Sequence, residues 1–254
     1  MSLRNRVALV TGAAGGIGSA VARELAAQGA DVALLDREPL DALAQQLRGI
    51  GHRAVTLTAD VTRGNEVRSA VAEAIAGLGR LDILVNVAGT VSFGAAERIT
   101  EEEWDRVQAI NLKGVFLCCQ AAIAPMRAQR HGRIVNIGSV LGKNGGNARP
   151  WMDPAEQDRA ANVAYGASKA GVHALTFYLA KELARDGITV NAVAPGPVAS
   201  AMTADFPERL RALIPAGRMG DAADVACACA FLAQDHAAYI TGEILDVNGG
   251  LWMD

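Results

Sequence analysis

Short apolar runs alternate with longer segments of helical periodicity along the chain. Runs of strand length occur at residues 7–10, 31–35, 54–58, 83–85, 134–137, 189–193 and 244–247. Their hydrophobicity is nearly continuous rather than alternating, which is typical of strands that are buried on both faces. The helical segments between them are suited to right-handed crossovers between parallel strands. The pattern therefore predicts an α/β fold, a doubly wound parallel sheet of about seven strands with helices on both faces.

Two segments interrupt this alternation, and both follow predicted strands. The first is an insertion at about 141–162, longer than the ~2–6 residues usual for such a connection. The second, at about 197–215, follows Pro195-Gly196-Pro197 and has apolar residues at near-helical spacing, so we expect a short amphipathic lid. The chain has 254 residues, without repeats or low-complexity linkers, and we expect residues 1–254 to form a single domain.

Composition and charge narrow the possible partners. Apolar residues make up 51% of the chain and charged residues 20%, which favours a homo-oligomer that buries part of its surface. The formal net charge is −3 and no dense Lys/Arg block occurs, so we expect no nucleic-acid partner. The N-terminus enters the first strand at once, and no apolar run approaches the ~20 residues of a membrane span. We therefore expect a soluble, cytoplasmic protein without a membrane partner.

The cysteines and histidines do not form a metal-binding pattern. The cysteines lie in helical, alanine-rich stretches, at Cys118, Cys119, Cys227 and Cys229. The histidines are dispersed, at His52, His131, His173 and His236. Neither set has metal-ligand spacing, so we expect reduced and mostly buried cysteines, surface histidines and no metal.

A glycine-rich turn follows the first predicted strand and precedes a helical pattern. Residues 11–18 read TGAAGGIG. Gly12 permits a tight turn, Gly16 allows the backbone to approach phosphates, and Gly18 allows the helix to pack on the strand. A dinucleotide pyrophosphate binds where bare backbone meets the positive end of a helix. The turn therefore predicts a dinucleotide site, although its G-x-x-x-G-x-G spacing differs from the commoner G-x-G-x-x-G.

Asp36 ends the second predicted strand, where a carboxylate can accept hydrogen bonds from the adenosine ribose. It would repel the 2′-phosphate of NADP, so it favours NAD. Arg37 is the contrary feature, because it could turn toward that phosphate. An ordinary surface aspartate is the alternative role of Asp36.

Four polar residues are candidates for catalysis. Tyr165 and Lys169 lie four residues apart at the start of a predicted helix, on one face and about 5–6 Å apart. A free tyrosine titrates near ~10, so it becomes a useful base only where a nearby positive charge favours the phenolate, and Lys169 could supply that charge. Ser139 ends the fifth strand and could polarise a substrate carbonyl or merely form a turn. Asn111 lies in a long helical pattern, where asparagine invites local irregularity.

Together these motifs resemble the short-chain dehydrogenases/reductases over nearly the whole chain, and thus a Rossmann-type fold. Residues 11–18 are similar to that family's cofactor loop, Asp60-Val61 to its adenine contact and residues 86–89 to its NNAG strand end. Asn111, Ser139, Tyr165 and Lys169 match its catalytic tetrad, and Pro195-Gly196 matches the segment before its lid. The resemblance also implies dimers or tetramers, with a homotetramer as the expected assembly.

The resemblance implies a role for each matched residue. Tyr165 would be the general acid/base, Ser139 would orient the reacting oxygen, and Lys169 would hold the nicotinamide ribose and lower the tyrosine pKa. Asn111 would keep a proton-relay water. The expected cofactor contacts are Gly12, Ala14, Gly16, Ile17, Gly18, Asp36, Arg37, Asp60, Val61, Asn86, Ala88, Gly89, Tyr165, Lys169, Pro195, Gly196 and Val198.

Two departures from the family pattern affect what can be transferred. Val87 replaces the second asparagine of NNAG, a change that we expect the cofactor site to tolerate. The segment between Ser139 and Tyr165 is longer than usual, so we expect the insertion to reshape or cover the substrate entrance.

Three functional hypotheses follow. The first is an NAD-dependent oxidoreductase that interconverts a secondary alcohol and a ketone by hydride transfer. The second, in the same class, is an NADPH-dependent reductase of 3-oxoacyl thioesters of the acyl-carrier-protein type, against which Asp36 argues. The third is a non-catalytic nucleotide-binding regulatory protein, which the complete tetrad disfavours. The sequence leaves the substrate and the reaction direction open.

Overall fold

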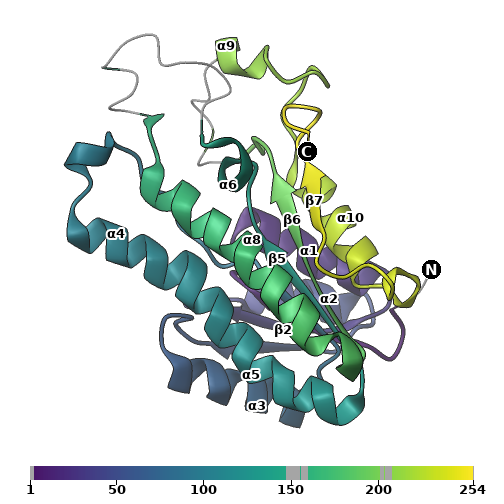
Figure 1. Ribbon diagram of the computed structural model, residues 1–254. Coiled ribbons are helices and arrows are strands. Elements are labelled where there is room, and N and C mark those ends of the chain that lie inside the picture. The colour runs from purple at the N-terminus through teal and green to yellow at the C-terminus, as the bar shows by residue number, and fades with distance from the viewer. Residues whose placement is uncertain (1–2, 147–154, 156–159, 201–202, 204–207, 254) are drawn as a thin grey trace.

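Figure 1 shows the computed structural model, which describes residues 3–146, 155, 160–200, 203 and 208–253. Within these residues seven parallel strands form one sheet, in the order β3-β2-β1-β4-β5-β6-β7. The strands are β1 (Val7–Thr11), β2 (Asp31–Asp36), β3 (Ala54–Thr58), β4 (Ile83–Asn86), β5 (Gly132–Ile137), β6 (Ile188–Pro195) and β7 (Ile244–Val247). Each overlaps a predicted strand, and the predicted doubly wound sheet is confirmed.

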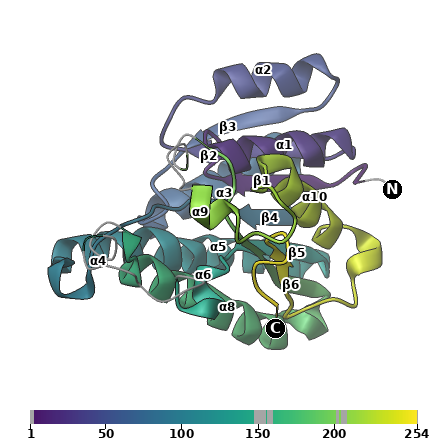
Figure 2. The same ribbon diagram turned by 90° about the horizontal axis from the view of Figure 1, so that it is seen from above.

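Helices cover both faces of the sheet, as Figure 2 shows from above. One face carries α1 (Gly16–Ala27), α2 (Asp41–Gly49) and α10 (Ala222–Leu232). The other carries α3 (Gly64–Leu78), α5 (Gly114–Gln129) and α8 (Val163–Leu183). The shorter helices are α4 (Glu101–Gln108), α6 (Leu141–Asn144) and α9 (Glu208–Arg211), and 3₁₀ turns occur at Ala96–Arg98, Ala184–Asp186 and Asp235–Ala237.

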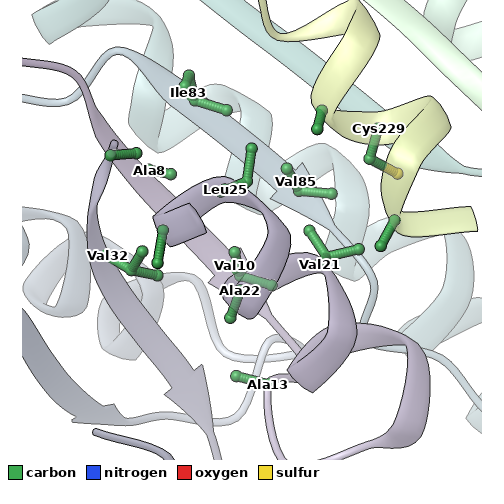
Figure 3. Packing of buried hydrophobic residues seen from close by; sticks show 14 of the residues in the cluster. Ala8, Val10, Ala13, Val21, Ala22, Leu25, Val32, Ile83, Val85 and Cys229 are labelled. Carbon is green, nitrogen blue, oxygen red and sulfur yellow. The ribbon is translucent and has the colours of Figure 1, made fainter. Parts of the chain in front are cut away.

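Alternate residues of the central strands face the two helical layers. In β1, Ala8 and Val10 pack toward α1 and α10, whereas Val7 and Leu9 pack toward α3 and α5. Figure 3 shows the first of these layers, where small and branched side chains of α1 meet β1 and β4, with Cys229 of α10 beside them. Burial on both faces explains the continuous hydrophobicity of these strands.

The two edge strands differ from this expectation. In β3, the burial of Ala54 and Leu57 contrasts with the exposed side chains of Thr56 and Thr58, and β7 is only partly buried after Ile244. An edge strand has a neighbour on one side only, so part of its surface faces solvent. The prediction of burial on both faces is therefore wrong for these two strands.

Side-chain caps define the start of two helices. Thr100 accepts a hydrogen bond from the backbone N–H of Glu103 at the start of α4. At α10, Asp221 and Asp224 each accept a hydrogen bond from the other's backbone N–H and form a capping box. These contacts satisfy N–H groups that the first helical turn leaves without a partner.

One helical run in the described part of the chain, Glu101–Gln129, is long enough to cross a membrane, and its most apolar 18 residues have a mean hydropathy of 1.4. The sequence expectation concerned uninterrupted apolar runs, and Lys113 and Gln120 interrupt this one, so the helix does not contradict it. The run packs on the sheet through Cys118, Cys119 and Met126, and 39% of its apolar window is buried. A core helix meets the same criterion, so this single run is weak evidence for a span.

The two predicted irregular segments are only partly described. The insertion contributes α6 and residues 160–162, where Gly94 and Asn162 form a parallel bridge. The lid contributes α9, while Met202 and Phe206 lie outside the described residues. Figure 1 places α9 beyond the ends of β6 and β7, and α6 follows the end of β5, so both lie at the carboxyl edge of the sheet, where open α/β sheets bind ligands.

A buried carboxylate organises the opposite, amino edge of the sheet. The side chain of Asp82 is 0% exposed and accepts hydrogen bonds from Arg80 at 2.6 and 2.7 Å, from Arg6 at 3.2 Å and from the Val7 N–H at 3.0 Å. His131 lies 3.4 Å away and bridges to Asp235. Burial opposes ionisation, but hydrogen bonds from His131, Arg80 and Val7 outweigh it and hold the pKa of Asp82 well below its usual range.

We expect Asp82→Asn to lower the free energy of unfolding by about 3 kcal/mol at neutral pH, because the cations around it lose their buried counter-charge. A depressed folded-state pKa stabilises the fold above the unfolded value of about 3.9, and the effect is lost as pH falls through the folded value. Urea denaturation measures the loss, which should shrink below about pH 4. The matched control is Asp235→Asn, whose carboxylate is 63% exposed and should cost less than about 1 kcal/mol. Equal losses in both variants would contradict this assignment.

Candidate active site

The glycine turn has the geometry expected from its sequence. Gly12 has φ +66°, and a Cβ there would lie 2.7 Å from the backbone nitrogen of Ala88. A Cβ on Gly18 would lie 2.0 Å from the Gly12 carbonyl oxygen, so only glycine allows α1 to start this close to the turn. Apart from its chain neighbours and the nearby backbone of its own helix, no described atom lies within 4 Å of a Cβ built on Gly16. The turn therefore has no space for a side chain at Gly12 or Gly18, and it has space for one at Gly16.

Asp36 is held at the end of β2 by three backbone N–H groups. Oδ2 accepts from Ala14 at 3.0 Å, and Oδ1 accepts from Arg37 at 2.7 Å and Glu38 at 3.2 Å. Arg37 is 66% exposed, and its guanidinium lies 3.9 Å from Asp60. Burial opposes ionisation of Asp60, but hydrogen bonds from Thr62 together with Arg37 and Arg63 lower its pKa. The structure therefore places the ribose candidate Asp36 beside the glycine turn and directs Arg37 toward Asp60.

Thr11 links the glycine turn to the end of β4, a contact that the sequence reasoning missed. Its hydroxyl accepts hydrogen bonds from the backbone N–H groups of Val87 at 3.0 Å and Ala88 at 3.1 Å. Val87 makes this contact through its backbone, as any residue could. Asn86 points away from the turn and donates to Asn136 at 2.9 Å inside the core. Its side chain is therefore a core contact, and only the backbone of this segment lines the turn.

Pro195 and Gly196 lie at the end of β6, on the same edge of the sheet. Gly196 donates its N–H to the Val247 carbonyl at 3.0 Å, and a Cβ there would lie 2.8 Å from Cβ of Asn248. Val198 pairs with Gly220 in a short parallel bridge. This segment therefore closes the edge of the sheet beside β7.

Tyr165 and Lys169 share one face of α8, as predicted. The Lys169 ammonium lies 5.7 Å from the centre of the Tyr165 ring and donates to the Ile137 carbonyl at 2.7 Å. Burial lowers the pKa of Lys169 to about 8. Burial also raises the pKa of Tyr165, and a hydrogen bond with Ser139 lowers it by less. The expected lowering of the tyrosine pKa by Lys169 is therefore absent in the chain alone, because desolvation of the phenolate dominates.

Ser139 follows β5 and reaches the same place from the sheet. It is buried, and its hydroxyl accepts a hydrogen bond from the Leu141 N–H at 3.2 Å, as in a serine turn. Ser139 also forms a hydrogen bond with Tyr165, so the same side chain both forms the turn and lies beside the phenol. The structure thus brings Ser139, Tyr165 and Lys169 together.

Asn111 lies in a π-helical turn, Ala109–Lys113, between α4 and α5. This is the local irregularity that asparagine predicted. Its Oδ1 accepts from the Thr90 N–H at 2.8 Å, and its Nδ2 donates to the Thr90 carbonyl at 2.9 Å and to Ser168 at 3.0 Å. A Cβ on Gly89 would lie 3.4 Å from Asn111 Oδ1 and 3.7 Å from Lys169 Nζ, so both atoms face Gly89.

His173 is a further residue of this site, and the prediction of a surface histidine is wrong for it. It lies in the middle of α8, buried, four residues beyond Lys169, and its Nε2 lies 3.4 Å from the Ser139 backbone nitrogen. The four-residue spacing of Tyr165, Lys169 and His173 could have indicated that they share a helix face. The prediction of a surface position rested instead on the dispersal of the histidines along the chain.

In the part of the chain that is described, no group of three or more His, Cys, Asp or Glu side chains is arranged to hold a metal ion, and the expectation of no metal stays a prediction. Cys118, Cys119 and Cys229 are buried and Cys227 is exposed, all as free thiols. Burial raises the pKa of the three buried thiols, so they are poor nucleophiles.

Comparisons with known proteins agree with this geometry. A family model described as enoyl-(acyl carrier protein) reductase matches residues 12–252. The chain belongs to the short-chain dehydrogenase/reductase family. It is 40% identical to a 3-oxoacyl-[acyl-carrier-protein] reductase of Staphylococcus epidermidis, over 98% of this chain and 100% of that protein. It is also 40% identical to the (2S)-[(R)-hydroxy(phenyl)methyl]succinyl-CoA dehydrogenase subunit of Thauera aromatica, over 98% of each. The crystal structure of gox2181 superposes with a TM-score of 0.89 at 37% identity, covering 98% of this chain and 96% of that one.

The family uses NAD(P), and the glycine turn fits a dinucleotide of this kind. Gly15 and Gly16 are exposed at the start of α1, and within the described residues no side chain caps its first N–H groups. Bare N–H groups at the positive end of a helix bind phosphate oxygens. A Cβ on Gly16 would stand in the open space at this point. As a short-chain dehydrogenase/reductase, the chain is an oxidoreductase that acts on CH–OH groups.

The two glycines of α1 allow a test that separates folding from cofactor binding. We expect Gly18→Ala to lower the free energy of unfolding by about 1–3 kcal/mol, because its Cβ meets the Gly12 carbonyl. Gly16→Ala should fold with unchanged or higher stability, because alanine is the better helix former. It should instead weaken NADH binding by about tenfold, or ~1.4 kcal/mol. Denaturation and calorimetric titration measure both, and undiminished NADH affinity in Gly16→Ala would contradict the phosphate site.

Proposed function

We propose that this oxidoreductase interconverts a ketone and a secondary alcohol by direct hydride transfer, with Tyr165 as general acid/base. The convergence of Tyr165, Ser139 and Lys169 beside the glycine turn carries this proposal. A bound nicotinamide cofactor supplies or accepts the hydride. The glycine turn, the backbone of residues 86–89 and Lys169 would hold that cofactor.

In this mechanism Ser139 orients the substrate oxygen and Tyr165 exchanges the proton. In reduction the phenol donates its proton to the developing alkoxide, and in oxidation the phenolate removes the hydroxyl proton. Burial favours the neutral phenol of the free chain, which is the form needed for reduction. Oxidation needs additional positive charge near the phenol, and the oxidised nicotinamide supplies it when bound.

Lys169 and Asn111 support this centre. Burial brings the pKa of Lys169 to about 8, so its ammonium can lose and regain a proton near neutral pH. Its bond to the Ile137 carbonyl holds its ammonium 5.7 Å from the centre of the Tyr165 ring, and Lys169 would hold the nicotinamide ribose. The Asn111 side chain uses its amide to hold Thr90 and Ser168, and a water at the π turn would continue the proton path from Lys169.

We assign the substrate to the 3-oxoacyl and 3-hydroxyacyl thioesters. Two relatives at 40% identity have names that specify acyl thioesters, one attached to acyl carrier protein and one to CoA. These relatives favour the thioester hypothesis over an unspecified secondary alcohol. The chemistry at Tyr165 is the same for both substrate classes. A purely regulatory nucleotide-binding protein would not need this tetrad, in which Asn111, Ser139 and Lys169 are buried.

We propose NAD as the preferred cofactor. The carboxylate of Asp36 is fixed beside Ala14 by backbone hydrogen bonds and would repel a 2′-phosphate. Arg37, the residue that could attract that phosphate, is paired with Asp60. A homotetramer and a cytoplasmic location remain predictions from the sequence.

The first test is turnover with acetoacetyl-CoA, followed by loss of NADH absorbance. We expect the wild type to reduce it more efficiently, by kcat/KM, than a simple ketone such as cyclohexanone. Tyr165→Phe should lower kcat by about 10²–10⁴-fold because it removes the proton donor, while NADH affinity and stability persist. Unchanged activity in Tyr165→Phe would contradict the mechanism, and a higher kcat/KM for the simple ketone would contradict the thioester assignment.

The second test compares cofactors. We expect NADH to bind at least about tenfold more tightly than NADPH, or ~1.4 kcal/mol. Asp36→Ala should reduce this ratio by removing the repulsion, whereas the matched variant Arg37→Gln should leave it unchanged or increase it. Fluorescence titration of each of the three proteins with NADH and with NADPH measures all six affinities. Tighter NADPH binding by the wild type would overturn the proposed preference.

A further inference from the structure

Three side chains of α8 hold the end of β5. Lys169 donates to the Ile137 carbonyl, Tyr165 bonds to Ser139, and His173 lies against the Ser139 backbone. The first two belong to the proposed reaction. The third has no role in the mechanism described above, although it is buried one helical turn from Lys169.

The imidazole of His173 occupies a slot between two glycines that flank Ser139. A Cβ on Gly138 would lie 2.2 Å from Nε2 and 2.7 Å from Cδ2 of His173. A Cβ on Gly142 would lie 2.9 Å from Cε1. The ring therefore contacts the backbone on both sides of Ser139, and any residue other than glycine at 138 would displace it.

A hydrogen bond joins the His173 ring to the Ser139 backbone. The Ser139 N–H donates to Nε2 at 3.4 Å, so Nε2 acts as the acceptor. On the other side of the strand end, the Gly138 N–H donates to the Val193 carbonyl at 2.8 Å. The backbone N–H groups of Gly138 and Ser139 are thus both held by hydrogen bonds. The Ser139 hydroxyl lies beside Tyr165.

We infer that His173 is a positioning residue for catalysis, which fixes the Ser139 backbone so that the serine hydroxyl meets the substrate oxygen. This inference rests on the proposed function. In this inference His173 acts through the Ser139 backbone and does not contact the reacting atoms. A displacement of about 1 Å at such a site can lower a rate about 100-fold.

The test is a double-mutant cycle with His173→Leu and Ser139→Ala, read out as kcat for acetoacetyl-CoA. We expect His173→Leu to lower kcat by roughly 10- to 100-fold with little change in NADH affinity. In the Ser139→Ala background the same substitution should have almost no further effect, because the group that it positions is gone. Effects that multiply would overturn the inference.

Two further measurements separate positioning from a general role in packing. His173→Gln keeps an acceptor near the position of Nε2 and should retain kcat within about threefold, so it remains informative if His173→Leu fails to fold. Loss of the Ser139 contact should also raise the pKa of Tyr165, shifting the pH profile of the reverse, oxidative reaction upward in His173→Leu. A His173→Gln enzyme as impaired as Ser139→Ala would overturn the inference. A wild type inactive on every ketone and thioester would overturn the proposed function as well, which distinguishes the two failures.

Discussion

The close approach of α8 to the end of β5 determines the geometry of the candidate site. Lys169 reaches the Ile137 carbonyl, and His173 reaches the Ser139 N–H, because Gly138 and Gly142 leave room for the helix. Parallel strand order then places the glycine turn after β1 and the end of β4 at the same edge of the sheet. A larger residue at either glycine would separate the proton-transfer groups from the cofactor turn.

The packing of α8 against the end of β5 removes water from Lys169 and Tyr165, which disfavours their charged forms. Desolvation lowers the pKa of Lys169 to about 8 and raises the pKa of Tyr165, so it shifts both groups toward their neutral forms. A bound cofactor and substrate change that balance, because positive charge near the phenol favours the phenolate. Groups whose protonation depends on what is bound are suited to moving a proton at one step of a cycle.

Periodicity predicted the strands of this fold well, because burial on both faces leaves a continuous apolar signal in β1, β4 and β5. It also located the edge strands β3 and β7 but overestimated their burial, because the place of a strand in the sheet depends on the rest of the chain. Local spacing likewise predicted that Tyr165 and Lys169 share a helix face and that Asn111 disturbs a helix.

The parts of the site that sequence reasoning missed depend on contacts between distant segments. His173 is buried only because the glycines after β5 face it, more than 30 residues earlier in the chain. The pKa of Tyr165 moves opposite to the expected direction because the extent of burial follows from packing and not from spacing. Thr11 acts across the sheet on Val87 and Ala88, which no local pattern indicates.

The central claim is that hydride passes directly between a nicotinamide and a carbon held beside Ser139 and Tyr165. The most direct measurement is reduction of acetoacetyl-CoA with NADH that carries deuterium at the transferred position of the nicotinamide ring, followed by mass spectrometry and NMR of the product. The account predicts one deuterium on the carbon that bears the new hydroxyl group. A product with only hydrogen at that carbon, or deuterium found only in water, would contradict it.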